Sequence, residues 1–413
     1  MTRGLAVLLL ALVVAPSALA ADVARRVEDA LTVRSPGGSV RARLSGLADL
    51  EGWWTDDPPP GLVFGEGEAF VNPRLTLFLD VWLGERLYAM AQARVDRGFD
   101  PREASGADAR ADEYLLRWTP LGDPRLHLQV GKFATVAGNW VGRHLSWDNP
   151  LITAPLPYEN VTTITDAAVP DARAAFVARR DVPDLKRDWI PVVWGPSYAT
   201  GAAAFGAVGR FDWALEVKNA ALAARPAEWD ATDRDFDEPT VTGRLGLRPS
   251  APWALGVSAS TGSYLQEDAV RRLPGTLGAD DARQTVAAAD LRWSRRRLEV
   301  WAEAFAARYE VPIARRVPRT DDADTVAWYL ETRWRFRRDA WAAARWNQQV
   351  FGDVPDGRGG DAAWDRDAWR LDLGLGWRPL RWAQAKVQYA YRHNRGPLQQ
   401  GEQTVVAQVT AKF

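Results

Sequence analysis

The sequence predicts an all-β protein, a 16-stranded antiparallel transmembrane β-barrel with a long third external loop. Three observations support this fold class. Apolar and polar residues alternate with period two in many short segments. Short and long connections between these segments follow one another strictly. Tryptophans, 21 in all, concentrate beside the short connections.

The alternating segments have the pattern of half-buried strands. In one of them Leu87, Ala89 and Ala91 lie on one face, and Gln92 and Arg94 lie on the other. Small or apolar residues on one face and charged residues on the other are what a strand between lipid and water requires. The predicted strands are 39–49, 70–82, 85–96, 110–119, 125–132, 199–209, 210–220, 240–248, 253–262, 283–295, 297–308, 325–337, 340–351, 367–378, 381–393 and 402–413.

The connections separate into two kinds. Every even-numbered strand is followed by a short turn, such as Gly84 or Arg338-Asp339, and every odd-numbered strand by a longer segment. Barrels of the bacterial outer membrane have short periplasmic turns and long external loops. A β-sandwich has no reason to sort its loop lengths in this way, so the alternation favours the barrel.

A tryptophan lies within a few residues of every short turn. Such a ring at one height is the aromatic girdle that forms where a membrane meets water. Three of these residues, Trp82, Trp341 and Trp382, fall on the polar face of the predicted register. The tryptophans in question are Trp82, Trp118, Trp213, Trp253, Trp293, Trp334, Trp341, Trp377 and Trp382.

The two ends of the sequence indicate export. Residues 1–20 combine a basic lead, an apolar run and the Ala18-Leu19-Ala20 cleavage pattern, so they are predicted to be a secretory signal peptide. Residues 21–38 are then a short periplasmic segment, and residues 39–413 form the barrel. The last strand alternates up to Phe413, and it has to pair with the first strand to close the sheet.

Composition excludes several other classes of protein. Cysteine is absent, which excludes a disulfide scaffold and thiolate metal sites. The formal net charge is −1, so nothing favours a nucleic-acid partner. No segment after the signal peptide has the length and apolarity of a membrane helix. We expect neither a cofactor nor a metal ion.

The lumen is the predicted functional site. A closed sheet of about 16 strands leaves a water-filled interior, whereas one of about eight strands is filled by side chains. The longest connection, residues 133–198, follows the fifth strand, and it is rich in tryptophan, proline and apolar residues. A long loop of this kind within a compact fold is usually functional.

Sixteen strands, a long third loop and a C-terminal phenylalanine resemble the Gram-negative outer-membrane porins. The resemblance implies that the long third external loop is folded into the lumen and narrows the barrel, that its charged residues face a set of arginines across the constriction, and that the barrel is a homotrimer. It also implies that Phe413 is a signal for the barrel-assembly machinery. The loop residues are Arg143, Asp148, Glu159, Asp166 and Asp171, and the basic set is Arg41, Arg43, Arg333, Arg335, Arg345 and Arg370.

A second, weaker resemblance concerns the phosphate-selective porins. Gly131-Lys132-Phe133 leads from a strand into the long loop as a similar segment does in that family. The family also has a ladder of lysines, and this sequence departs from it, because it contains only a few lysines.

These patterns predict a porin of the outer membrane that passes small hydrophilic solutes. Inward cations outnumber inward anions, which predicts a mild anion preference. The expected partners are outer-membrane lipid and lipopolysaccharide, the latter through ions bridged by loop carboxylates such as Asp321, Asp322 and Asp324. Two alternatives stay open: an outer-membrane enzyme, for which His144, Ser146 and Asp148 are the candidate residues, and a substrate-specific channel plugged by the long loop.

Overall fold

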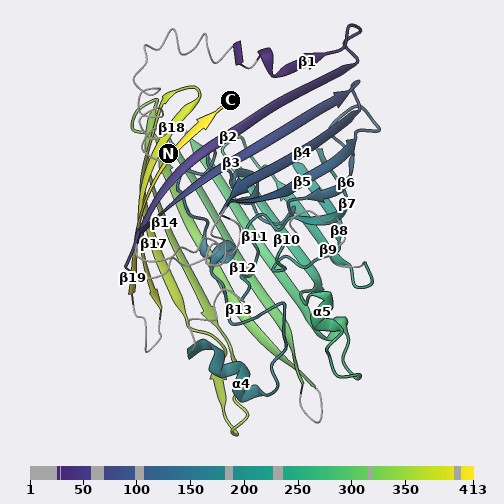
Figure 1. Cartoon of the computed structure of the whole chain (residues 1–413), viewed down its shortest axis with the longest axis vertical. Helices are drawn as coiled ribbons and strands as arrows, with labels where there is room; N and C mark the ends of the chain where they lie inside the picture. The colour runs from purple at the N-terminus through teal and green to yellow at the C-terminus, as the bar shows by residue number, and fades with distance from the viewer. Residues whose placement is uncertain are drawn as a thin grey trace.

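The computed structural model describes residues 26–27, 29–56, 69–97, 107–181, 189–226, 236–314, 319–394 and 401–413. The predicted signal peptide, residues 1–20, lies outside these ranges. Consecutive antiparallel strands form one barrel, shown in Figure 1. Its strands are β2 (Val40–Thr55), β3 (Ala69–Leu83), β4 (Leu87–Asp96), β5 (Asp108–Trp118), β6 (His127–Phe133), β7 (Ala199–Val208), β8 (Phe211–Lys218), β9 (Thr240–Leu247), β10 (Trp253–Ser263), β11 (Arg283–Arg295), β12 (Leu298–Ile313), β13 (Arg319–Trp334), β14 (Ala340–Phe351), β17 (Ala368–Leu380), β18 (Ala383–Asn394) and β19 (Gly401–Lys412).

The barrel closes between its last and first long strands. β19 pairs with β2 in a register that runs from Thr404 opposite Thr55 to Lys412 opposite Leu47. Every barrel strand in the described part of the chain therefore has two neighbouring strands. Closure is a requirement in lipid, where an unpaired backbone group costs several kcal/mol.

The predicted fold class is confirmed, because each of the sixteen predicted segments overlaps one barrel strand. The strand ends differ in places. β2 continues to Thr55, and β12 reaches Ile313, so both extend beyond their predicted limits. The pairing of β4 with β5 also shifts between Gln92 and Ala93, which marks a β-bulge that the alternation does not reveal.

Short elements outside the barrel complete the fold. β1 (Thr32–Arg34) pairs with β2, so part of the predicted periplasmic segment 21–38 forms a hairpin with the barrel. β15 (Asp353–Pro355) and β16 (Asp361–Ala363) pair with each other. Helices α4 (Arg173–Ala178) and α5 (Glu267–Val270) lie at the end of the barrel opposite to the C-terminus (Figure 1). No helix in the described part of the chain is long and apolar enough to cross a membrane.

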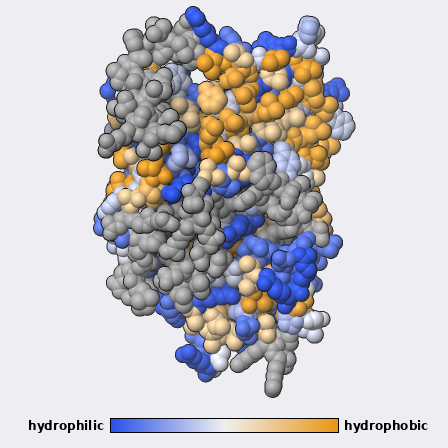
Figure 2. Space-filling view, in the orientation of Figure 1, coloured by the Kyte–Doolittle hydropathy of each residue, from blue (hydrophilic) through white to orange (hydrophobic). Residues whose placement is uncertain are grey.

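The outer face of the barrel is apolar, as membrane contact requires. Leu215, Leu245 and Leu375 are among its exposed side chains. Figure 2 shows hydrophobic residues gathered in the part of the barrel near the C-terminus, with hydrophilic residues on either side of them. This band contains the side chains that are to face lipid.

The predicted tryptophan ring is present at the end of the barrel that carries the short turns. Trp118, Trp253, Trp334 and Trp377 are exposed there, and Trp253 stands opposite Trp293 on the neighbouring strand. Trp82 and Trp341 were predicted as members of the ring, and this part of the prediction is wrong, because both point inward as their strict alternation places them. Trp82 packs beneath Arg41 with the guanidinium carbon 4.4 Å from the ring centroid, and Trp341 donates a hydrogen bond to the carbonyl of Pro150.

The described parts of the loop that connects β6 to β7, residues 134–181 and 189–198, contact inward-facing side chains of the barrel. The loop contains η1 (Val141–Arg143), α3 (Leu156–Glu159), α4 and η2 (Arg179–Asp181). Its apolar residues join those of β10 to β13 in the largest buried cluster of the protein, where Trp140 and Tyr158 meet Trp301 and Phe305. The inner faces of β10 to β13 therefore form an apolar surface against which the loop packs on one side of the lumen.

The closure seam depends on a glycine. The backbone groups of Gly46 and Phe413 exchange hydrogen bonds of 3.0 and 3.1 Å. A Cβ atom on Gly46 would stand 2.4 Å from Cζ of the Phe413 ring, so the ring occupies the space that glycine leaves.

We expect Gly46→Ala to destabilise the barrel by about 1–3 kcal/mol, because the added methyl group overpacks this contact. Unfolding by urea in lipid vesicles measures the change. Phe413→Ala on the Gly46→Ala background should restore part of the loss, since the clash then disappears. Strictly additive effects of the two substitutions would contradict this account of the seam.

Candidate functional site

The candidate site is the region of the lumen where residues 139–159 of the long loop meet inward-facing side chains of the barrel. Strand alternation places every second residue of β12 to β18 toward the lumen. Many of these residues are charged, yet most of them are buried, because the loop covers them. The contacts between these residues and the loop determine the position of the loop.

Arg345 and Arg370 are the centre of the contact between loop and barrel. Nε of Arg345 lies 2.9 Å from the Asp372 carboxylate, and its Nη1 lies 3.1 Å from that of Glu331. The remaining nitrogen of Arg345 donates to the Thr153 and Ala154 carbonyls, both at 3.0 Å. These guanidinium groups thus bridge the strands to the loop backbone.

Arg370 makes a parallel set of contacts. It forms an ion pair with Glu159 of the loop and another with Asp372, in which Nε is 3.0 Å from Oδ1. Glu159 also accepts a hydrogen bond from the backbone N–H of Ala154 at 2.9 Å. Both arginines are about 1% exposed, so their charges are fully engaged by neighbouring groups.

Lys386 holds a neighbouring part of the loop. Its ammonium group donates to the carbonyls of Ser146, Asn149 and Leu151 at 2.8, 3.1 and 2.9 Å. A Cβ atom on Gly374 would come within 2.5 Å of the Leu151 side chain, so the glycine provides room for the loop. Gln388 accepts from the next two backbone N–H groups, those of residues 152 and 153.

A third anchor lies on β12 and β13. The buried carboxylate of Glu303 accepts hydrogen bonds from the Trp140 backbone N–H at 2.7 Å and the Tyr158 hydroxyl at 2.5 Å. Arg143 of the loop pairs with Glu331 at 2.6 Å. Since a carboxylate buried in this way costs free energy unless it is fully bonded, these contacts favour a single loop position.

The opposite edge of the same loop segment faces β4. The Tyr198 hydroxyl and Nε2 of His144 are 2.8 Å apart, and the Gln92 amide donates to the same hydroxyl at 3.3 Å. Nδ1 of His144 lies 2.6 Å from the Val141 carbonyl, so it carries the proton and Nε2 accepts. Burial lowers the pKa of His144 to about 4, and the positive charges of Arg94 and Arg74 act in the same direction.

A separate group of arginines surrounds one carboxylate near the short turns. Arg333, Arg335 and Arg292 all approach Glu299, at 2.8, 3.1 and 3.5 Å respectively. The side chains of Arg292 and Arg335 are about half exposed. One carboxylate cannot neutralise three guanidinium groups, so this part of the lumen carries an excess of positive charge.

Arg378 adds to this excess. It bonds to the Trp147 carbonyl at 2.7 Å and stacks over the Trp147 ring at 4.2 Å. Within the described part of the chain, no carboxylate forms an ion pair with it. The Arg378 guanidinium group is repelled by the positive charges of Arg333 and Arg335 and attracted by the carboxylate of Asp148 in the loop. We call Arg292, Arg333, Arg335 and Arg378 the lumenal arginine cluster.

The predicted site residues therefore divide into separate groups. Arg345, Arg370, Arg143 and Glu159 meet in the buried contact between loop and barrel. Arg333 and Arg335 belong to the lumenal arginine cluster. The remaining predicted residues lie elsewhere: Arg41 is exposed beside Trp82, Arg43 stands opposite Asp80 in the pairing of β2 with β3, Asp148 and Asp171 are exposed on the loop, and Asp166 is fully buried.

Several residues of the site were not predicted. Asp112 lies at the β-bulge and pairs with Arg94 at 2.8 Å, and Glu51 lies in the unpredicted extension of β2, where it pairs with Arg74 at 2.6 Å. The polar anchors Gln388 and Tyr198 were also missed. A strict alternation of side chains carries no signal for a bulge, and uncharged residues gave no reason to be singled out.

The carboxylates considered as lipopolysaccharide contacts were predicted in an external loop, but they lie in β13, which begins earlier than predicted, and they are paired with arginines. Asp321 pairs with Arg173, and Asp322 and Asp324 both pair with Arg308, at 3.3 and 2.7 Å. In the described part of the chain, no group of three or more His, Cys, Asp or Glu side chains could hold a metal ion.

Lys132 and Lys218 are both bound to main-chain oxygen. Lys132 donates to the Ala111 carbonyl at 2.7 Å, and Lys218 donates to the Phe133 carbonyl at 2.8 Å. Lys132 is the lysine of the Gly131-Lys132-Phe133 segment, and both lysines are only 2% exposed. Both ammonium groups are therefore bound to the backbone near the start of the long loop, and they do not form a row of solute ligands along the lumen.

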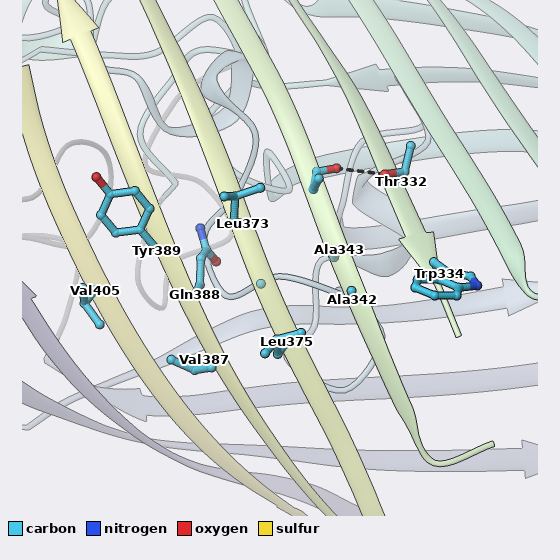
Figure 3. Close-up of a pocket in the computed structure, with 12 residues that line it drawn as sticks. Thr332, Trp334, Ala342, Ala343, Leu373, Leu375, Val387, Gln388, Tyr389 and Val405 are labelled. Carbon is cyan, nitrogen blue, oxygen red and sulfur yellow. Dashed lines mark hydrogen bonds between the residues drawn. The ribbon is translucent and has the colours of Figure 1, made fainter. Parts of the chain in front are cut away.

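A depression on the outside of the barrel is distinct from this site. Figure 3 shows Leu373, Leu375, Val387 and Val405 around it, on β17, β18 and β19. These side chains are exposed on the outer face, and the lining is almost wholly apolar. It faces the membrane and gives no access to the lumen.

Comparison with known proteins supports the fold. No protein-family model and no curated protein sequence matches this chain. Solved structures of outer-membrane channels do. The chain is similar to the channel DcaP of Acinetobacter baumannii (TM-score 0.58, 11% identity, 92% of this chain and 99% of that chain covered). It is also similar to OmpF of Salmonella typhi (0.56, 10%, 92% and 100%) and to an anion-selective porin of Comamonas acidovorans (0.54, 11%, 91% and 100%). The protein thus has the porin-like fold of outer-membrane channels.

We expect Lys386→Met to loosen the loop between Ser146 and Leu151 and to cost about 2 kcal/mol, because three carbonyls lose a charged donor. Protease cleavage within the loop and increased current noise measure this effect. Arg381→Gln, which removes one positive charge from an exposed turn, is the matched control and should change neither quantity. Equal behaviour of the two variants would contradict the anchoring role.

We expect the contact between His144 and Tyr198 to depend on pH. The pKa of His144 lies below its ordinary value of about 6.5, so the contact contributes stability above that pH and loses it as the pH falls through about 4. Current recordings from pH 8 to pH 3 should show added fluctuations only at the acidic end. His144→Gln, which can still accept the hydroxyl but does not titrate, should remove that component; if it persists, other groups cause it.

Proposed function

We propose that this protein is an outer-membrane porin that passes small hydrophilic solutes and prefers anions. The lumenal arginine cluster carries this proposal, because three guanidinium groups, two of them about half exposed, share the single carboxylate of Glu299. Positive charge in a confined aqueous passage raises the local concentration of anions and repels cations. The similarity in fold to an anion-selective porin supports the same reading.

The arginines in the contact between loop and barrel have another role in this proposal. Arg345 and Arg370 have their donors occupied by carboxylates and loop carbonyls, so they fix the constriction and leave solute contact to other groups. Gly142, Asp148 and the half-buried His144 are accessible on the loop and form its edge toward the open lumen. The loop thereby narrows the passage from one side.

An enzymatic function receives no support from the candidate triad. Both ring nitrogens of His144 are within hydrogen-bond distance of other groups, Tyr198 and the Val141 carbonyl. A general base needs a free nitrogen directed at its nucleophile. His144 therefore acts as a structural residue of the loop in this proposal.

The remaining parts of the proposal concern export and assembly. Residues 1–20 are to be removed as a signal peptide, Phe413 is to serve the barrel-assembly machinery, and the barrel is to form homotrimers in a membrane with lipopolysaccharide. The proposed passage of solutes through the lumen does not depend on any of these points. Each can be tested by itself in the exporting cell.

The first experiment is to record single-channel currents of the refolded protein in a planar bilayer, with the reversal potential measured in a salt gradient. Stable conductance steps and a reversal potential shifted toward that of chloride are expected. A folded barrel without conductance would instead favour a channel plugged by the loop and specific for one substrate. A shift toward the potassium potential would contradict the anion preference.

Substitutions then test the lumenal arginine cluster. We expect Arg292→Gln with Arg335→Gln to lower the ratio of chloride to potassium permeability about twofold, since two unneutralised charges leave the passage. Glu299→Gln should raise it. Arg358→Gln, in an exposed external loop, removes charge outside the lumen and should have no effect. Selectivity that is the same in all variants would show that other residues set it.

A further inference from the structure

The short turns at one end of the barrel are rich in arginine. Every one of them carries at least one arginine, and the only acidic residues among them are Glu85, Asp123 and Asp339. Asp123 pairs with Arg125 and Asp339 with Arg337, yet most of the guanidinium groups have no such partner among the described residues. We call these turn arginines the basic rim: Arg86, Arg125, Arg210, Arg248, Arg296, Arg297, Arg337, Arg338 and Arg381.

The basic rim lies just beyond the tryptophan ring. Trp334 lies three residues before Arg337, and Trp377 lies four residues before Arg381. On the same strands, Leu330 and Leu375 are exposed on the apolar outer band. Moving toward the turns, the outer surface thus passes from aliphatic residues to indoles and then to guanidinium groups. This order matches the acyl chains, interface and headgroups of a lipid leaflet.

The arginines of the rim are exposed on all sides of the barrel. They come from the connections between consecutive strand pairs, so they follow the whole circumference instead of one face. A docked protein would need a concentrated patch with apolar residues at its centre. A ring of cations at headgroup height is complementary to a surface that surrounds the barrel.

We propose that the basic rim binds the phosphate groups of anionic glycerophospholipids in the leaflet that contacts the short turns. Arginine suits this ligand, because its planar guanidinium group donates two parallel hydrogen bonds to phosphate oxygens. Indoles directly below the rim pack against the glycerol and upper acyl region. The inference depends on the barrel spanning a membrane and does not depend on what passes through the lumen.

The experiment compares lipid preference in mixed vesicles of phosphatidylcholine and phosphatidylglycerol. Spin-labelled phosphatidylglycerol and spin-labelled phosphatidylcholine report the relative association of each lipid with the refolded barrel. We expect the wild-type protein to prefer the anionic lipid about two- to threefold at low salt and less at high salt. Equal association of the two lipids with the wild-type protein would overturn the proposal.

Two matched quadruple variants locate the effect. Arg296→Gln, Arg297→Gln, Arg337→Gln and Arg338→Gln together should lower the preference, because they remove four of the rim's guanidinium groups. Arg271→Gln, Arg272→Gln, Arg319→Gln and Arg358→Gln, at exposed positions near the other end, should retain it. All eight side chains are exposed, so heat-modifiable migration of each folded variant is expected to be normal.

Other results would overturn the proposal in informative ways. A rim variant with unchanged lipid preference would show that the rim does not bind lipid. If that variant instead loses binding to isolated peptidoglycan, the rim serves an anionic polymer. Unchanged channel conductance of the rim variant is expected in every case, which separates this test from that of the proposed transport function.

Discussion

A backbone group in hydrocarbon has no water to bond to, and the whole architecture follows from this constraint. β19 has to meet β2, and the strands between them have to tilt and stagger until the sheet closes. In the closed sheet, each strand side chain faces either the lipid outside or the lumen inside. Residues that face outward contact lipid, so they are apolar, and residues that face inward are free to carry charge.

The inward charges are used in two physically different ways. Near the middle of the chain's long loop, Arg345 and Arg370 are surrounded by carboxylates and carbonyls, where loss of one partner would leave the other charge buried. In the lumenal arginine cluster the guanidinium groups outnumber the carboxylates and remain in contact with water. The first arrangement gives the loop one position, and the second gives the passage its electrostatic character.

The sequence was sufficient for the strands because a two-residue period between lipid and water is a strong signal. It was also sufficient for most of the tryptophan ring, but not for Trp82 and Trp341, which were assigned to the ring and point inward. It could not indicate which inward arginines the loop would cover. That outcome depends on contacts between residues far apart in sequence, such as Arg345 with Thr153. It also depends on the β-bulge at Asp112 and Glu113, where the strict alternation of inward and outward side chains is interrupted.

The anchors of the long loop have a consequence for the order in which the barrel is built. The loop belongs to the first half of the chain, but Lys386 reaches the Ser146 carbonyl across 240 positions of sequence, and Arg345 reaches Thr153 across 192. Contacts this distant close late, after the intervening strands have paired. The loop therefore lacks these anchoring contacts until β14, β17 and β18 have joined the sheet. A chain stalled before those strands would hold a barrel segment with an unfastened interior, a state that quality-control proteases can recognise.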